Sequence, residues 1–204
     1  MYFCSKYKNW EHMTTSIDIA RRIAEVNHPL SRESVHALAE ILVCRKYRKG
    51  EIVLQAGEVC KSMLFIEKGM LRQFYYKYDK DLTAHIGYEN GMIICIESYF
   101  KQEPTRLMVE TLEASVVWEL PRVEVEKLID QYHDIERLYR GFIEHSLIES
   151  QVKADTLRFE PAHERYNRLL QLHPEILKRA PLVYIASLLQ MTPETLSRVR
   201  SSLL

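Results

Sequence analysis

The spacing of apolar residues changes twice along the chain, and the first stretch has the period of an amphipathic helix. "SIDIARRIAEV" (16–26) and "SRESVHALAEILV" (31–43) place apolar residues three and four positions apart. Ser31 and Ser34 supply hydroxyls that can satisfy the free amides at a helix start. The pattern therefore predicts two helices in this stretch.

Short runs of β-branched and aromatic residues follow, with five of the six glycines between residues 50 and 91. The runs are 51–55, 62–67, 70–78, 83–89, 91–96 and 115–120, the last of which is ended by Pro121. Such closely spaced strands predict a barrel or a sandwich. Within them, "YYKYDKDL" (75–82) predicts a hairpin with Asp79 and Lys80 in the turn and half-buried tyrosines.

After Pro121 a long helical pattern runs to about residue 158, and it is too long for one ordinary helix. We expect a break near 132–134. The second part keeps an apolar stripe, which resembles an imperfect coiled-coil seam and indicates a partner helix. Its residues are Ile135, Leu138, Phe142, Ile148 or Glu149, Val152 and Thr156. The alternative is a helix face that packs within the same chain.

The stretch "LVYIASLLQMTPETLSRVR" (182–200) has the spacing of two short helices that cross steeply. Relative to Ala186, apolar residues lie at −1, +3, +5, +10 and +13, so the small alanine marks the closest approach. Thr192 can cap the second helix, and Pro193 fits its first turn.

The face of the second helix left for solvent carries hydroxyls, one carboxylate and arginine. Arginine can read guanine, glutamate can accept from cytosine, and hydroxyls reach bases or phosphates. The predicted DNA-binding residues are Thr192, Glu194, Thr195, Ser197, Arg198 and Arg200. From residue 161 to the end, six basic residues oppose three acidic ones, a local excess of three within a chain of zero net charge.

Composition and motifs exclude several function classes. The four cysteines (Cys4, Cys44, Cys60 and Cys95) lack metal-type spacing, which indicates free thiols and a reducing cytoplasm. No histidine pair, phosphate loop or nucleophile motif occurs, so we expect no metal, no cofactor and no enzyme activity. No secretory signal or membrane-spanning segment is recognised. Met13 is an alternative translation start to Met1.

The order of these elements is similar to that of the Crp/Fnr family of bacterial transcription regulators. "YRKGEIVLQAGEVCKSMLFIEKGMLRQFYY" (47–76) resembles the opening of the family's cyclic-nucleotide-binding-like β-roll, and "IASLLQMTPETLSRVR" (185–200) resembles its helix-turn-helix. The resemblance implies an α+β fold: a β-roll of double-stranded β-helix (jelly-roll) type, a long dimerisation helix and a helix-turn-helix. The corresponding ranges are an N-terminal helical segment 1–30, the roll 31–132, the dimerisation helix 133–158 and the DNA-binding domain 159–204.

The chain departs from the family pattern in three places. In the phosphate cassette that binds cyclic AMP in the family, the Gly-Glu pair falls on Cys95 and Ile96, and the arginine falls near Thr105, with Arg106 one place on. A shift of one residue in a strand turns a side chain to the other face, so we expect Arg106 not to replace that arginine. Gln190 lies where the family often has glycine, and the chain ends at Leu204, before any strands of a wing.

The resemblance thus predicts a cytoplasmic regulator that binds double-stranded DNA as a homodimer. Its effector is an unidentified small molecule or is absent, and cyclic AMP is not expected. RNA polymerase is a candidate partner, and no membrane partner is expected. The alternative is a ligand-binding or protein-interaction module whose terminal helices do not read DNA.

Overall fold

The computed structural model describes residues 14–202, and it begins with a pair of helices. These are α1 (Ser16–Asn27) and α2 (Arg32–Ile41). Thr15 and Asp18 form a capping box at the start of α1, and the Ser31 hydroxyl accepts from the Ser34 amide at 3.1 Å. Both predicted helices are therefore confirmed. Cys4, Met13 and Leu204 lie outside the described residues.

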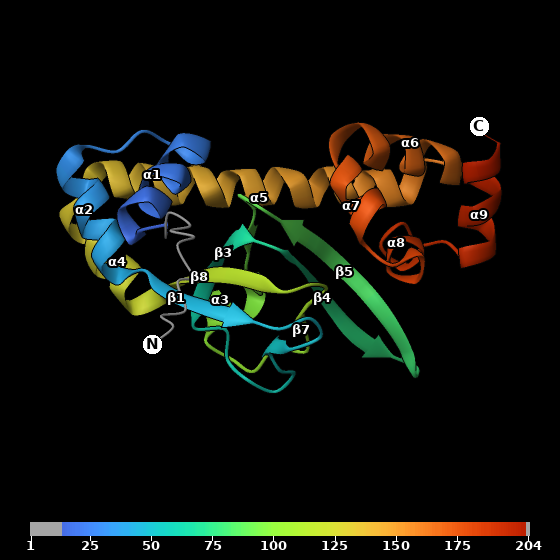
Figure 1. The fold of residues 1–204 in the computed structure, drawn as a ribbon, viewed down its shortest axis with the longest axis horizontal. Coiled ribbons are helices and arrows are strands. Elements are labelled where there is room, and N and C mark those ends of the chain that lie inside the picture. Colours follow the sequence, from blue (N-terminus) through green and yellow to red (C-terminus); the bar gives the residue numbers. More distant parts are fainter. Residues whose placement is uncertain (1–13, 203–204) are drawn as a thin grey trace, which may run out of the picture.

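Eight antiparallel strands form two four-stranded sheets, ordered β1-β8-β3-β6 and β2-β7-β4-β5, which close into the β-roll (Figure 1). The strands are β1 (Val43–Tyr47), β2 (Ile52–Leu54), β3 (Ser62–Lys68), β4 (Met70–Lys77), β5 (Lys80–Tyr88), β6 (Met92–Ile93), β7 (Met108–Thr111) and β8 (Ser115–Pro121). Buried residues from both sheets, such as Phe65, Leu71 and Val117, fill the space between them. The predicted β-roll is confirmed.

Two details of the strand prediction are wrong. The run 91–96 is strand only at β6, because Cys95 caps the short helix α3 (Ile96–Lys101). The β4–β5 hairpin turns at Tyr78 and Asp79, whose φ angles of 51° and 59° match a type I′ turn. Tyr78 at this tip is 87% exposed rather than half-buried.

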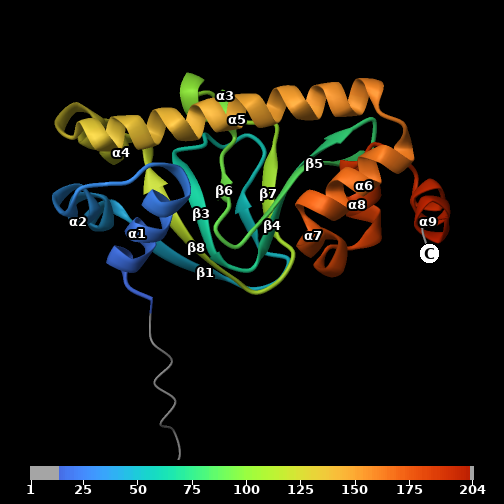
Figure 2. The same cartoon turned by 90° about the horizontal axis from the view of Figure 1, so that it is seen from above.

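The long helical pattern breaks where expected. Helix α4 (Arg122–Gln131) is capped by Tyr132, and α5 (His133–Phe159) then runs along most of the molecule (Figure 2). Its first half packs on α1 and α4 and buries three residues of the predicted seam: Ile135, Leu138 and Phe142. Their assignment to a dimer seam is therefore wrong, because these side chains already belong to the core of their own chain.

Four short helices complete the chain: α6 (Ala162–Leu172), α7 (Pro174–Arg179), α8 (Leu182–Leu188) and α9 (Pro193–Ser201). They surround a second core, which also takes in Met70, Ile86 and Leu112 from the roll. Figure 2 shows α7 and α8 beside β5, with α9 at the outer end of the molecule. Within residues 14–202, no helix has both the length and the hydropathy of a membrane span.

Candidate nucleic-acid interface and cassette

Helices α8 and α9 pack around a shared core that contains Ala186 and Leu196. This alanine is fully buried, and its carbonyl accepts a hydrogen bond from the Met191 amide at 2.9 Å. The chain reverses at Gln190, whose φ of 51° lies in the left-handed region. A residue with a β-carbon is strained there by about 1 kcal/mol, so the glycine preference at this turn is real and Gln190 violates it.

The start of α9 is fixed by its own side chains. The Thr192 hydroxyl accepts from the Thr195 amide at 3.2 Å, and Pro193 occupies the first turn. Hydrogen bonds from its own backbone amide and from the Thr192 hydroxyl lower the pKa of Glu194. The carboxylate therefore stays ionised at the positive end of the helix.

The outward side of α9 is the open face, defined by Glu194, Ser197, Arg198 and Ser201. All four are exposed, whereas Leu196 on the inward side is 1% exposed. These residues recur at intervals of three and four, so they share one side of the helix. The sequence prediction missed Ser201, which this same spacing could have identified.

The remaining predicted DNA-binding residues, Thr192, Thr195 and Arg200, lie outside the open face. Thr192 is exposed at the helix cap, and Thr195 is half-buried and accepts a hydrogen bond from Arg198 at 3.3 Å. Arg200 follows Arg198 by two residues, which turns it about 200° around the helix. It lines a surface pocket together with Leu196. The structure thus separates Arg200 from Arg198.

The opposite side of the C-terminal helices is the docked face, which packs on the roll. The Thr83 amide of β5 donates to the Ser187 hydroxyl of α8 at 2.8 Å. Arg72 of β4 stacks on the ring of Tyr184 at 3.5 Å. Because Arg72 is 2% exposed, its charge requires partners: it contacts Asp81 at 2.6 Å and Glu110 at 2.5 Å.

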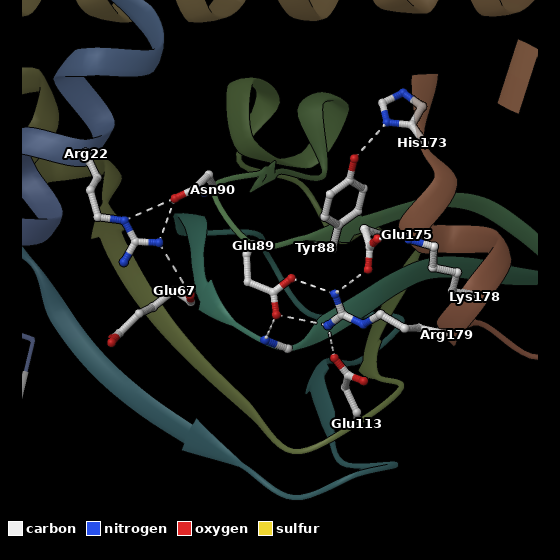
Figure 3. Close-up of polar contacts among 11 residues, drawn as sticks. Arg22, Glu67, Tyr88, Glu89, Asn90, Glu113, His173, Glu175, Lys178 and Arg179 are labelled. Carbon is white, nitrogen blue, oxygen red and sulfur yellow. Dashed lines mark hydrogen bonds and ion pairs between the residues drawn. The ribbon is translucent and has the colours of Figure 1, made fainter. Parts of the chain in front are cut away.

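A second polar contact joins α7 to the roll (Figure 3). Arg179 contacts both oxygens of Glu89 at 2.7 and 2.9 Å, and it also contacts Glu113. The hydrogen bond from Arg179 is the main cause that lowers the pKa of Glu89 to about 2. Tyr88 and His173 add a contact of 3.2 Å between the hydroxyl and Nδ1.

Ion pairs with carboxylates neutralise several of the basic side chains that make up the charge excess of the C-terminal segment. Arg179 faces carboxylates of the roll, Lys178 pairs with Glu175, and Arg168 pairs with Glu160. The excess is therefore not one continuous basic surface, and Arg198 is the basic residue of the open face.

In the cassette, the structure brings together Cys95 and Thr105 and turns the other two predicted residues outward. Cys95 and Thr105 are buried, and their side chains are hydrogen-bonded. Ile96 is 42% exposed. Arg106 is exposed, with its guanidinium 5.3 Å from the centre of the Tyr75 ring.

Two further residues complete the cassette, and the sequence prediction missed both. The Gln73 amide nitrogen donates to the Ile94 carbonyl at 2.9 Å and lies 3.4 Å from the Cys95 sulfur. Cys60 contacts Cys95 from the loop before β3. The sequence held one indication of this position. Gln73 lies two residues after the core residue Leu71, so its polar side chain points to the same face of β4.

The second half of α5 leaves part of the predicted stripe exposed. Val152 is 40% exposed, and its neighbours Ile148 and Leu147 are 59% and 70% exposed. Ile148 and Val152 are four residues apart and share one side of the helix. Both belong to the predicted stripe, and Leu147 extends the exposed apolar surface.

Comparison with known proteins agrees with this architecture. Residues 44–132 match the family model of the cyclic nucleotide-binding domain. No curated protein matches the sequence. The chain is similar in structure to the catabolite activator protein of Thermus thermophilus, with 19% identity, 89% of this chain and 86% of that chain covered, and a TM-score of 0.56.

Two other solved structures are similar. FixK2 of Bradyrhizobium japonicum has 19% identity and a TM-score of 0.66, with 80% of this chain and 84% of that chain covered. CLP of Xanthomonas campestris, described as a c-di-GMP-responsive global regulator, has 16% identity and a TM-score of 0.62, with 85% and 91% covered. The chain therefore has the fold of the Crp/Fnr regulators, in which a cyclic-nucleotide-binding-like β-roll is followed by a long helix and a helix-turn-helix.

Proposed function

We propose that this protein is a transcription regulator that binds specific sequences in double-stranded DNA through the open face of α9. The observation that carries the proposal is the exposure of Glu194, Ser197 and Arg198 on one side of a helix whose N-terminus is capped by Thr192. A helix that enters the major groove places such residues against base edges. Arg198 has the donor geometry that reads guanine, and Glu194 can accept from cytosine.

Thr192 and Arg200 have a supporting role in this proposal. Both are exposed outside the open face, Thr192 at the start of α9 and Arg200 on the side of the pocket, where they are accessible to a phosphate backbone. Contacts to phosphate fix the position of a helix in the groove without reading sequence. Loss of Arg200 should therefore weaken binding to all duplexes by a similar factor.

The regulator acts as a homodimer in this proposal, and α5 supplies the interface. Its exposed apolar residues Leu147, Ile148 and Val152 form a stripe that pairing with a second α5 would remove from water. A two-fold dimer binds two half-sites separated by about 34–36 Å, which corresponds to a near-palindromic operator.

Cyclic AMP is not the effector in this proposal. The Gln73 side chain already donates to the Ile94 carbonyl in the cassette, and the neighbouring buried positions are Cys95 and Thr105. Arg106 lies on Tyr75 at the surface. The cassette therefore offers a phosphate no buried guanidinium among these residues, and an effector would have a different chemistry.

The test of DNA binding is a selection from random duplexes at moderate salt, followed by sequencing. We expect enrichment of a palindromic motif by the natural protein. A matched variant with Glu194→Ala, Ser197→Ala and Arg198→Ala should enrich nothing, although it should unfold at the same denaturant concentration. Recovery of the same unenriched pool by both proteins would contradict the proposal.

The test of the dimer is sedimentation equilibrium of the double variant Ile148→Glu with Val152→Glu. We expect a monomer, because two charges at the centre of the stripe would be desolvated in the interface. Val123→Glu on α4 is the control, since Val123 is equally accessible at 62% exposure but lies outside the stripe. A dimer that survives the double variant would place the interface elsewhere.

A further inference from the structure

Two cysteines that are 35 positions apart in the sequence meet inside the β-roll. Cys60 precedes β3, Cys95 caps α3, and their side chains are 5% and 2% exposed. Both are free thiols, and each side chain is the largest influence on the pKa of the other. Cys44, the third described cysteine, is exposed and is not part of this contact.

The backbone holds the two cysteines in place from both sides. The Cys60 amide donates to the Ser98 hydroxyl in the first turn of α3 at 2.9 Å. The Gln102 side chain, just after α3, reaches the Cys60 carbonyl at 3.4 Å. Val59 and Pro104 form a bridge beside this contact. Because cysteine has a short side chain, these backbone contacts keep the two thiols in the same part of the roll.

The surroundings shift the pKa values of the two thiols in opposite directions. Hydrogen bonds from the side chain and the backbone of Cys95 lower the pKa of Cys60. The same contact, together with burial, raises the pKa of Cys95, although Gln73 and Thr105 donate to its sulfur. Because the thiolate is the nucleophile, the lowered pKa makes Cys60 the more reactive of the two thiols.

We propose that Cys60 and Cys95 form a reversible dithiol–disulfide site inside the roll, with a hydroperoxide as the oxidant. The thiolate of Cys60 attacks a peroxide oxygen: the S–O bond forms, the O–O bond breaks, and the leaving oxygen takes a proton to give water or an alcohol. Cys95 then attacks the sulfur of the sulfenic acid. The S–S bond forms, the S–O bond breaks, and hydroxide leaves with the Cys95 proton as water.

In sum, two thiols lose two electrons and two protons, and the peroxide is reduced. The new bond would join the loop before β3 to the start of α3, so a disulfide here links covalently two segments that only pack and hydrogen-bond in the reduced protein. The site is independent of DNA binding, and its test requires no duplex.

The test uses the folded full chain with Cys4→Ser and Cys44→Ser, so that Cys60 and Cys95 are the remaining thiols. The protein is treated with hydrogen peroxide, alkylated with maleimide, and digested for peptide mapping. We expect both thiols to be lost in parallel, a cross-linked peptide that contains residues 60 and 95, and full recovery of both thiols with dithiothreitol.

Two results would overturn the proposal. One is that both thiols of the natively treated protein remain free, although the unfolded protein oxidises under the same conditions. The other is that each cysteine becomes sulfinic acid without the cross-linked peptide. A Cys95→Ser variant provides a second measurement. Without Cys95, oxidised Cys60 should accumulate as a sulfenic acid, which dimedone labels. The absence of this label in a folded variant would also contradict the mechanism. Should that variant not fold, the peptide map of the parent protein decides alone.

Discussion

The C-terminal helices have two sides built from different kinds of contact. The docked face consists of buried and paired groups: Arg72 against Tyr184, Thr83 against Ser187, and Arg179 against Glu89. The open face of α9 consists of exposed polar groups such as Arg198, whose hydrogen bonds lie within its own helix. Buried paired charges are costly to disturb, whereas exposed ones contribute little to folding. The comparison teaches that similar polar residues hold the C-terminal helices to the β-roll on one side and are free to contact DNA on the other.

The largest effect is expected from Arg72→Ala on the docked side. It leaves Asp81 and Glu110 without their shared cation and removes the guanidinium from the Tyr184 ring. We expect the free energy of unfolding to fall by about 3 kcal/mol, as measured by urea denaturation. Arg106→Ala is the matched control, because this exposed arginine should cost no more than about 0.5 kcal/mol. Equal losses would show that Arg72 is no more important than a surface arginine.

A smaller effect is expected where the two helices cross. Ala186→Leu inserts methylenes at a fully buried position and should destabilise the protein by about 2 kcal/mol. Because the open face depends on this crossing, duplex binding should be lost as well. Val183→Leu on the same helix is the control: this residue is 55% exposed, so neither stability nor binding should change. A stable Ala186→Leu variant with normal DNA affinity would contradict the crossing geometry.

The pair of Glu89 and Arg179 gives the docked face a pH dependence. Arg179 lowers the pKa of Glu89 from 4.5 to about 2, so the folded protein holds this proton less tightly than the unfolded chain. The stabilisation is therefore present above about pH 4.5 and is lost as the pH falls toward 2. Glu89 is one third exposed, which limits the contribution to about 1 kcal/mol.

Urea denaturation between pH 5 and about pH 2.5 measures this contribution. The loss of stability on acidification should be smaller in Arg179→Ala than in the natural protein. Lys178→Ala, at the next position and paired only with Glu175 in the surface helix, should leave the slope unchanged. If all three proteins lost the same free energy of unfolding on acidification, the assigned role of Glu89 would be contradicted.

The smallest effect belongs to the turn between the two faces. Gln190→Gly removes the strain of a left-handed φ but gives the unfolded chain more freedom. We expect the free energy of unfolding to change by no more than about 1 kcal/mol and the affinity for DNA to stay the same. Gln190→Val should destabilise instead, because a β-branched residue is worse in this conformation. If valine were tolerated as well as glycine, the turn would not be strained.

Local patterns predicted most of what lies close together in the sequence. Ala186, Thr192 and Pro193 identified the helix-turn-helix because crossing and capping depend on neighbours within one turn or two. The strands β1 and β7 were missed. Three of the five residues of β1 are exposed at the sheet edge, so it shows no apolar alternation, and β7 has only four residues.

Features that depend on distant segments could not be predicted. Nothing near Arg72 shows that an arginine in a strand would be buried, since Glu110 and Tyr184 reach it from other parts of the chain. Nothing in the spacing of the cysteines indicates that residues 60 and 95 meet. The helical stripe on α5 had the correct period, but periodicity does not distinguish a partner helix from the chain's own core.

The measurement that tests the central claim most directly is the affinity of Arg198→Ala for the selected duplex, compared with that of Arg168→Ala. Both arginines are on helices of the C-terminal domain and are exposed, but Arg168 lies on α6 and pairs with Glu160. We predict that Arg198→Ala loses 1–3 kcal/mol, which is about 5- to 150-fold in Kd, and relaxes specificity at one base pair. Arg168→Ala should bind as the natural protein does. Equal affinities for both variants, or equal losses without any change in specificity, would contradict the claim that the open face of α9 reads DNA.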